Sequence, residues 1–485
     1  SRTLLSGYED KKTKMTELRL SNTLSGEKEV FEPLDEDDDR VLLYVCGLTV
    51  SDEPHLGHAR TWLSFDVLHR YLEYKGYDVK HVENVTDVDD KIINRAEEEG
   101  TTAAEVAARY AGQVYEDMVA LNLLRVDVRP HVTEHVDEII EMTERLVERG
   151  YAYEADDGVY FDVSEFDGYG KLSGQKIEEL EQGEESEAKE DPADFALWKL
   201  VPDDAPNEEP SWDSPWGEGR PGWHIECSAM STCHLGDTID IHGGGRDLVF
   251  PHHENEIAQA EAATGEEFTR YWLHVGPLRV EDEKMSSSLG NFWTVHDALE
   301  EYDANEIRAF LISTQYTKPQ MFDDDALEEG AKRWARLENA YRACEEAMDS
   351  SDARAKERDD ALRDAVDEAR EGFVDSMDDD LNTPGALAAL FGLVDAVNAH
   401  VEEPPYDYVG LFGAWRTFGE LAGDVLGFDF SRGEGDVSRV IEAVLALREE
   451  LRESGEYETA DAVRDAIEEA GVEVQDTDDG ATYRL

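Results

Sequence analysis

Two histidines, His55 and His58, lie three residues apart after an apolar run and a loop. At that spacing they would share one face of a helix, whose first turn offers unpaired backbone N–H groups that bind phosphate. Pro54 stands where a first helical turn tolerates proline. The pattern predicts a nucleotide site, although histidines at the start of a surface helix are also ordinary.

A lysine in a hydroxyl-rich loop is the second candidate. Lys284 opens the segment Lys284-Met-Ser-Ser-Ser288, which follows the last predicted strand. A lysine on such a loop can bring positive charge to a triphosphate as it is cleaved. The alternative is a plain surface loop, which is the commoner case for an isolated motif of this kind.

Four side chains are candidates for metal binding. His252 and Glu256 are four residues apart and so share a helix face, whereas His253 has no ligand at that offset. Cys227 begins the preceding predicted helix, and Cys46 ends the first predicted strand. Two thiolates, an imidazole and a carboxylate suit zinc. The alternative for each cysteine is an ordinary buried residue, which spacing alone does not exclude.

A parallel sheet is the scaffold that would bring these groups together. Residues 41–46 are predicted to form a strand, residues 54–74 a helix and residues 78–85 a second strand. This order favours a βαβ unit, whose ligands bind beyond the carboxyl ends of the strands. The pattern resumes with a helix from 223, a strand at 238–242, glycines at 243–245, a helix opening at 250–256 and a strand at 272–280.

The expected architecture is α/β. A Rossmann-like parallel-sheet catalytic domain is split by an insertion and followed by an α-helical bundle and a small C-terminal module. The insertion is expected to hold a helix at 135–149, a hairpin within 151–170 and an acidic loop at 177–194. The bundle is expected to have helices near 305–313, 327–348, 359–377 and 383–400. The module is expected to have helices at 438–453 and 458–470, with β-like ends at 472–474 and 481–483.

Changes in composition and pattern set the expected boundaries. Residues 1–14 are basic, unlike the rest of the chain, and are treated as an N-terminal extension. The remaining segments are 15–120 and 221–300 for the two catalytic halves, the second with the lysine loop, 121–220 for the insertion, 301–430 for the bundle and 431–485 for the module.

The charge of the chain is extreme. Its 485 residues include 115 Asp and Glu against 45 Lys and Arg, a formal net charge of -70. Disorder does not explain this composition, because periodic apolar segments with aromatic residues run along the whole chain. Salt at about 1 M reduces the Debye length to about 3 Å and screens the repulsion. Because no apolar run of membrane-spanning length and no signal peptide occur, we expect a protein of a high-salt cytoplasm.

The motifs together resemble a known family. His55-Leu-Gly-His58 and Lys284-Met-Ser-Ser-Ser288 resemble the His-Ile-Gly-His and Lys-Met-Ser-Lys-Ser signatures of class I aminoacyl-tRNA synthetases. Longer segments resemble cysteinyl-tRNA synthetases, and the resemblance covers residues 18–485. These segments are 44–50, 84–91, 221–230, 241–256 and 377–384.

The resemblance implies how an amino acid would be selected. In the family, the positions of Cys46, Cys227, His252 and Glu256 hold zinc, and Cys233 falls outside this set as a packing residue. A substrate thiolate binds zinc, whereas the hydroxyl of serine is a poor ligand for a soft metal, so no editing domain is required. Thr86, Trp223 and His242 are expected around the amino acid, with Trp223 alternatively a core residue.

The resemblance also implies the reaction. ATP and L-cysteine would form cysteinyl-adenylate, with His55, His58 and Lys284 stabilising phosphate charge and Mg²⁺ bound to the pyrophosphate. Asp247 is an expected adenosine ligand. Ser287 stands where the family motif has a second lysine, so the contribution of this position to ATP binding is in doubt.

Transfer of the cysteinyl group to tRNA(Cys) would complete the reaction. The helical bundle would contact the tRNA body and the C-terminal module its anticodon, with a monomer as the expected state. One alternative is a related ligase that joins cysteine to an amino-sugar, which lacks the C-terminal module. A non-catalytic zinc- or RNA-binding relative is the other, and it is disfavoured because both histidines and Lys284 are present.

The acidic composition makes a prediction about stability. The thermal unfolding midpoint should rise as potassium chloride is raised from about 0.1 M to about 2 M, because screening weakens the self-repulsion of the folded chain. Differential scanning calorimetry over this range measures the effect. Maximal stability in dilute buffer would contradict the high-salt interpretation.

Overall fold

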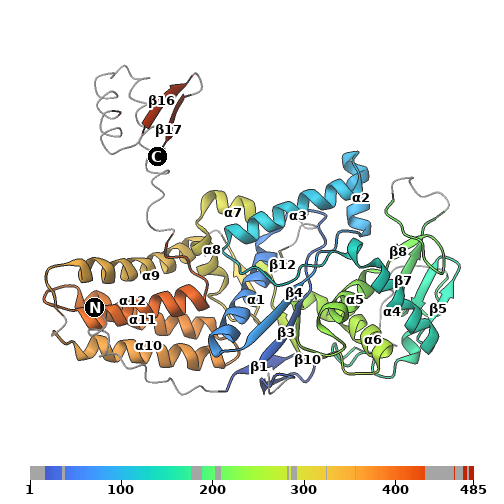
Figure 1. Ribbon diagram of the computed structural model, residues 1–485, viewed down its shortest axis with the longest axis horizontal. Helices are drawn as coiled ribbons and strands as arrows, with labels where there is room; N and C mark the ends of the chain where they lie inside the picture. Colours follow the sequence, from blue (N-terminus) through green and yellow to red (C-terminus); the bar gives the residue numbers. More distant parts are fainter. Residues whose placement is uncertain are drawn as a thin grey trace. The chain divides into compact units, whose positions relative to one another are not determined.

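The computed structural model describes residues 17–34, 39–175, 188–202, 209–280, 283–285, 292–323, 325–354, 357–431, 464, 473–477 and 480–484. The chain divides into two compact units, Ser1–Phe428 and Asp429–Leu485 (Figure 1). None of the described helices combines the length and apolar character needed to cross a bilayer.

The centre of the first unit is a sheet of four strands (Figure 1). Their order is β10 (Thr269–Val275), β9 (Ile239–Gly245), β3 (Arg40–Val45) and β4 (Asp78–Glu83). Every neighbouring pair is parallel, so the four carboxyl ends meet at one edge. The predicted α/β class with a parallel sheet is confirmed.

The prediction of a single strand over residues 272–280 was wrong. β10 ends at Val275, and β11 (Leu278–Val280) joins a different sheet with β12 (Glu283–Lys284) and β13 (Gln320–Phe322). Proline at 277 cannot donate to a ladder, and a Cβ at Gly276 would lie 2.5 Å from the backbone of Lys318. The chain therefore leaves the parallel sheet at this point.

Helix α1 (Leu56–Lys75) follows β3 as expected, but it begins later than predicted. Its N-cap is His55, which has extended backbone angles. Pro54 therefore precedes the cap instead of lying in the first turn, and its carbonyl accepts a hydrogen bond from the Val295 N–H at 2.9 Å. His55 is therefore the cap residue rather than part of the helix, but its ring still lies against the ring of His58.

Helices attach to the sheet through apolar contacts. In α5 (Trp223–Leu235), Cys227 and Leu235 pack against Tyr44, Val82 and Ile239 of the sheet. A separate core joins α1 to α2 (Asp90–Glu99), α3 (Ala103–Ala120), α7 (Val295–Glu301) and α8 (Ala304–Leu311). The helix expected from 250 is instead a π-helical turn, Val249–His253, that continues as α6 (Glu254–Thr264).

The predicted hairpin within residues 151–170 is present as β5 (Ala152–Ala155) and β6 (Gly158–Phe161). Residues 195–221 add two strands that periodicity did not indicate, β7 (Phe195–Leu200) and β8 (Gly219–Pro221), which complete a four-stranded antiparallel sheet. Helix α4 (Val136–Arg149) shares a core with this sheet and with α5 and α6. A hairpin of β1 (Arg19–Asn22) and β2 (Glu27–Val30), also not predicted, lies beside β10.

The later part of the first unit is helical, as the sequence indicated. It contains α9 (Ala326–Asp349), α10 (Asp360–Asp378), α11 (Thr383–His400) and α12 (Tyr408–Thr417), with the short strands β14 (Ala353–Arg354) and β15 (Tyr406–Asp407). In the second unit, β16 (Glu473–Thr477) pairs antiparallel with β17 (Gly480–Arg484). The expected extension at 1–14, the module's helix pair and most of the acidic loop lie outside the described residues.

A buried ion pair joins helix α1 to helix α8. The Arg308 guanidinium of α8 donates to Asp66 Oδ2 of α1 at 2.9 Å, and both side chains are almost fully buried. Arg308 also donates to the carbonyls of Leu121, Asn122 and Leu426. One side chain of α8 thus contacts α1, the end of α3 and the segment at Leu426.

Replacing Arg308 with Met should lower the free energy of unfolding by about 3–5 kcal/mol, because it leaves a buried carboxylate and several carbonyls with fewer partners. The matched control is Arg336→Met, since Arg336 pairs with Asp395 on the surface, and it should cost less than about 1 kcal/mol. Denaturant unfolding in high salt measures both. Equal effects of the two substitutions would contradict the assigned role of the buried pair.

Candidate active site

A cleft of about 600 Å³ opens at the carboxyl edge of the parallel sheet. Most of the residues singled out from the sequence line it. They are Cys46, His55, His58, Thr86, Trp223, Cys227, Asp247, His252 and Lys284. His242 and Glu256 are fully buried and are absent from the lining. Ser287 lies outside the described residues.

Backbone contacts between strand ends fix Cys46. Its N–H donates to the Gly243 carbonyl at 3.0 Å, which connects the end of β3 to β9. The next N–H, from Gly47, donates to Asn84 Oδ1 at 2.9 Å. A Cβ at Gly47 would lie 1.6 Å from the Asn84 carbonyl oxygen, so only glycine allows this approach.

The Glu256 carboxylate is the centre of the metal-ligand cluster. Its Oε1 lies 3.4 Å from Cys46 Sγ and 3.2 Å from His252 Nε2. Its Oε2 lies 3.3 Å from His242 Nε2. These side chains come from β3, β9, the π-helical turn and α6, which converge only in the folded chain.

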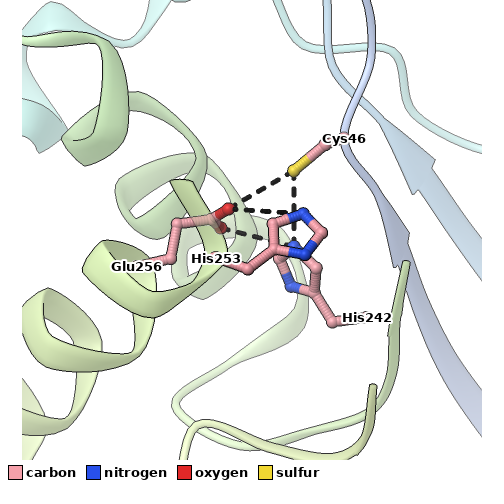
Figure 2. Close-up of side chains that lie close together, drawn as sticks. All are labelled: Cys46, His242, His253 and Glu256. Atoms are coloured by element: carbon pink, nitrogen blue, oxygen red, sulfur yellow. Dashed lines mark hydrogen bonds and ion pairs between the residues drawn. The ribbon is translucent and has the colours of Figure 1, made fainter. Parts of the chain in front are cut away.

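Two overlapping sets of four side chains could hold one metal ion. The first is Cys46, Cys227, His252 and Glu256, and the second is Cys46, His242, His253 and Glu256. Figure 2 shows the second set, with the two histidines and Cys46 facing the carboxylate. All members are buried, and the ligand atoms of each set lie within 4.8 Å of one another. The set predicted from the sequence is therefore brought together, but the structure also offers an alternative.

Histidine contacts outside the cluster differ between the two sets. His252 Nδ1 lies 2.9 Å from His224 Nδ1, which directs its Nε2 toward Glu256. His253 Nδ1 lies 2.7 Å from His274 Nε2, and its Nε2 remains 3.8 Å from Glu256 Oε1. Within the described part of the chain, His253 Nε2 and Glu256 Oε2 make no hydrogen bond. The closer approach of His252 favours the first set.

The cluster is electrostatically suited to a cation. A hydrogen bond from Cys46 lowers the pKa of Cys227 to about 6, while burial raises the pKa of Cys46. Burial opposes ionisation of Glu256, but His242 and His252 hold its pKa below the ordinary value. A buried carboxylate beside a buried thiolate requires compensating positive charge. The donor set therefore fits a divalent metal ion.

His55 and His58 cap the first turn of α1 reciprocally. The His58 N–H donates to His55 Nδ1 at 3.3 Å, and the His55 N–H donates to His58 Nδ1 at 3.2 Å. The rings stack with centroids 3.6 Å apart. Two of the N–H groups at the helix start are therefore used by the imidazoles and are not open to phosphate.

This cap sets the protonation of both rings. Because each Nδ1 accepts a backbone N–H, a neutral ring carries its proton on Nε2, which can donate to another group. Burial and the nearby Lys284 lower the pKa of His55 to about 4. Burial and His55 hold the pKa of His58 well below its ordinary value. Both rings are thus neutral hydrogen-bond donors at pH 7.

Lys284 lies at the cleft on β12 and forms an ion pair with Asp247. Its Nζ is 2.7 Å from Asp247 Oδ2, and both side chains are about half exposed. The sequence placed both residues at the ATP site but did not indicate that they contact each other. Lys284 has to leave this partner to reach a phosphate.

The three residues expected around the amino acid have different surroundings. Thr86 Oγ1 donates to Glu226 Oε2 at 3.2 Å. Trp223 stacks on His252 with centroids 4.5 Å apart and is 37% exposed, so it is not a core residue. His242 stacks on Trp272 beneath the cluster.

Several polar groups beside the site were not singled out from the sequence. Asn84 holds the β3 end, and burial raises the pKa of Glu226 well above its ordinary value. His253 and His274 are buried around the cluster, and His224 is partly buried there. The signal that could have identified these groups was a charged or histidine side chain within an otherwise apolar helix or strand. Cys233 was expected to be a packing residue, but it is exposed because it lies in the last turn of α5.

Comparison with known proteins identifies the family. Residues 31–332 match the class I (C) tRNA synthetase catalytic domain, residues 372–431 the DALR domain, and residues 434–484 the cysteinyl-tRNA ligase anticodon binding domain. A cysteine–tRNA ligase of Haloarcula marismortui is 54% identical, with 96% of this chain and all of the relative aligned. The chain belongs to the cysteine–tRNA ligase family.

Other relatives agree with this assignment. The cysteine–tRNA ligase of Halobacterium salinarum is 53% identical over 96% of this chain and 99% of its own length. Both organisms are halophilic archaea, in agreement with the acidic composition. A methionyl-tRNA synthetase of Mycobacterium tuberculosis bound by methionyl-adenylate superposes with a TM-score of 0.62 at 16% identity, over 80% of this chain and 92% of that one. That likeness shows a class I fold.

The histidine cap gives a pH prediction. In the folded protein His55 should titrate near pH 4, so its ring stays neutral well below the unfolded pKa of about 6.5. The folded chain binds fewer protons between these values, so the contribution of His55 to stability is lost as pH falls from about 6.5 towards 4.

Histidine NMR titration measures this midpoint, with His55→Gln used for assignment. His131 is an internal contrast, because its hydrogen bond to Asp87 raises the pKa of His131. A His55 midpoint at or above 6.5 would contradict the neutral-donor assignment.

Proposed function

We propose that this chain activates L-cysteine with ATP and transfers the cysteinyl group to the 3′ end of tRNA(Cys). The observation that carries the proposal is one cleft lined by both the Cys46–Cys227 thiols and the His55–His58 pair. A substrate that bridges these groups needs a thiol at one end and a phosphate at the other. Cysteinyl-adenylate has both.

We assign one zinc ion per chain to Cys46, Cys227, His252 and Glu256. Two sulfur donors, an imidazole and a carboxylate are a normal zinc set, and both cysteines face the cleft. When bound, zinc would supply a ligand position that accepts the substrate thiolate and discriminates against the serine hydroxyl. His242 and His253 would then orient the carboxylate and the neighbouring rings.

The proposed chemistry begins with attack of a cysteine carboxylate oxygen on the α-phosphorus of ATP, which releases pyrophosphate. The Nε2–H groups of His55 and His58 would donate to the phosphate oxygens as negative charge grows. Because these rings are neutral, Lys284 and Mg²⁺ would supply the positive charge. Asp247 would bind the adenosine once Lys284 leaves it. Ser287 would also contribute to the ATP site.

Around the amino acid, we assign Thr86, Trp223 and His242 to positioning. Thr86 stands at the end of β4, where Asn84 and Glu226 hold its hydroxyl. Trp223 offers an exposed ring face beside His252. His242 lies beneath the cluster and would act through Glu256. These side chains would fix the direction in which the cysteine carboxylate points.

The proposed partners and organisation follow the family. An aminoacyl-tRNA synthetase with an anticodon-binding domain uses a tRNA, ATP and an amino acid. We assign the two catalytic halves to 15–120 and 221–300, the insertion to 121–220, the tRNA-contacting bundle to 301–430 and the anticodon module to 431–485, after an extension at 1–14. A monomer working in the cytoplasm completes the proposal.

The deciding experiment is ATP–pyrophosphate exchange followed by aminoacylation, both in about 2 M potassium chloride. Exchange should require L-cysteine, should not occur with L-serine, and should fall after chelation and return with zinc. The product should then be cysteinyl-tRNA(Cys). Exchange without tRNA charging would favour the amino-sugar ligase, and no exchange at all would favour a non-catalytic relative.

Lys284→Ala should lower the rate of adenylate formation by at least about 10²-fold, since it removes one charged contact to the transition state. Lys171→Ala is the control, because Lys171 pairs with Glu261 on the surface and its loss should change the rate less than about twofold. Pyrophosphate exchange measures both. Exchange at the wild-type rate in Lys284→Ala would remove Lys284 from the mechanism.

A further inference from the structure

A second cluster of metal-ligating side chains lies outside the cleft. His135 is the N-cap residue of α4, while Cys233 and His234 occupy the last turn of α5. One ligand atom from each of the three lies within 4.8 Å of the others. None of the three lines the cleft described above.

The two imidazoles meet through equivalent nitrogen atoms. His135 Nε2 lies 2.9 Å from His234 Nε2, and the ring centroids are 5.0 Å apart. His135 Nδ1 lies 2.8 Å from the His131 carbonyl oxygen, which requires the proton on Nδ1. Nε2 of a neutral His135 therefore presents a lone pair to His234. A proton or a metal ion has to lie between the two rings.

The surroundings also match a metal ligand set. A histidine ligand commonly donates its second ring N–H to a carbonyl, as His135 does. Lys80 donates to the His234 carbonyl and holds the end of α5. Cys233 is exposed, so solvent and metal ions can reach its thiol.

We propose that His135, Cys233 and His234 form a second site for a divalent transition metal ion such as zinc, with water completing the coordination. Nitrogen ligands about 2.0–2.1 Å from a tetrahedral zinc are about 3.3–3.4 Å apart. The Nε2 atoms of His135 and His234 are 2.9 Å apart, so they would have to move apart only slightly to bind the ion. The site joins α4 to the helix that also carries Cys227. It would hold the end of α5 in place from outside the cleft.

Cobalt(II) binding tests the site in the full-length chain. Equilibrium dialysis against cobalt in about 2 M potassium chloride, with metal analysis, should give two equivalents for the wild type. Cys233→Ser and His135→Asn should each bind one, and both should keep the thiolate-to-cobalt absorption of the Cys46–Cys227 site. Cys227→Ser should retain the second site, and His296→Ala, an exposed histidine control, should bind two.

The outcomes separate this proposal from the proposed function. One equivalent in the wild type, or two in both Cys233→Ser and His135→Asn, would overturn the second site. Circular dichroism of each variant verifies that a lost equivalent is not lost folding. Cysteine-dependent pyrophosphate exchange is measured in parallel, and its absence alongside two bound cobalt ions would count against the proposed function while supporting the second site.

Discussion

The buried carboxylate of Glu256 is the constraint on which the site depends. It is fully buried between Cys46, His242 and His252, where an uncompensated charge would be very costly. The surrounding imidazoles offset part of this cost, and a metal ion would offset more. Three separate segments of the chain must converge for this compensation, so the electrostatics of one residue link the ends of β3 and β9 to the segment that forms α6.

The parallel sheet turns that convergence into a binding cleft. Because β3, β4 and β9 all end at one edge, the thiol cluster and the start of α1 both line a single opening. The histidine cap at the start of α1 adds a second constraint. It uses both Nδ1 atoms internally and leaves neutral Nε2–H donors, so in the proposed reaction the positive charge at the phosphate would come from Lys284 and bound cations.

Much of this arrangement could be predicted from the sequence. The strand at 41–46, the glycine run and the spacing of His252 and Glu256 identified the sheet edge and side chains that cluster there, because these signals are local. The helix start near Pro54 and the single strand over 272–280 were mispredicted, since a helix cap and a strand break depend on partners distant in the sequence. Periodicity could not reveal the Lys284–Asp247 pair, the competing His242–His253 ligand set or the exposure of Cys233, because each arises only from tertiary packing.

The central claim is that one cleft binds the thiol and the reacting phosphate together. A crystal structure with the non-hydrolysable analogue cysteinyl-sulfamoyl-adenosine tests it most directly. The account predicts the analogue's thiol against the Cys46, Cys227, His252 and Glu256 cluster, with the sulfamate within hydrogen-bonding distance of His55 or His58 Nε2. A thiol directed away from that cluster, or a sulfamate without contact to either histidine, would contradict it.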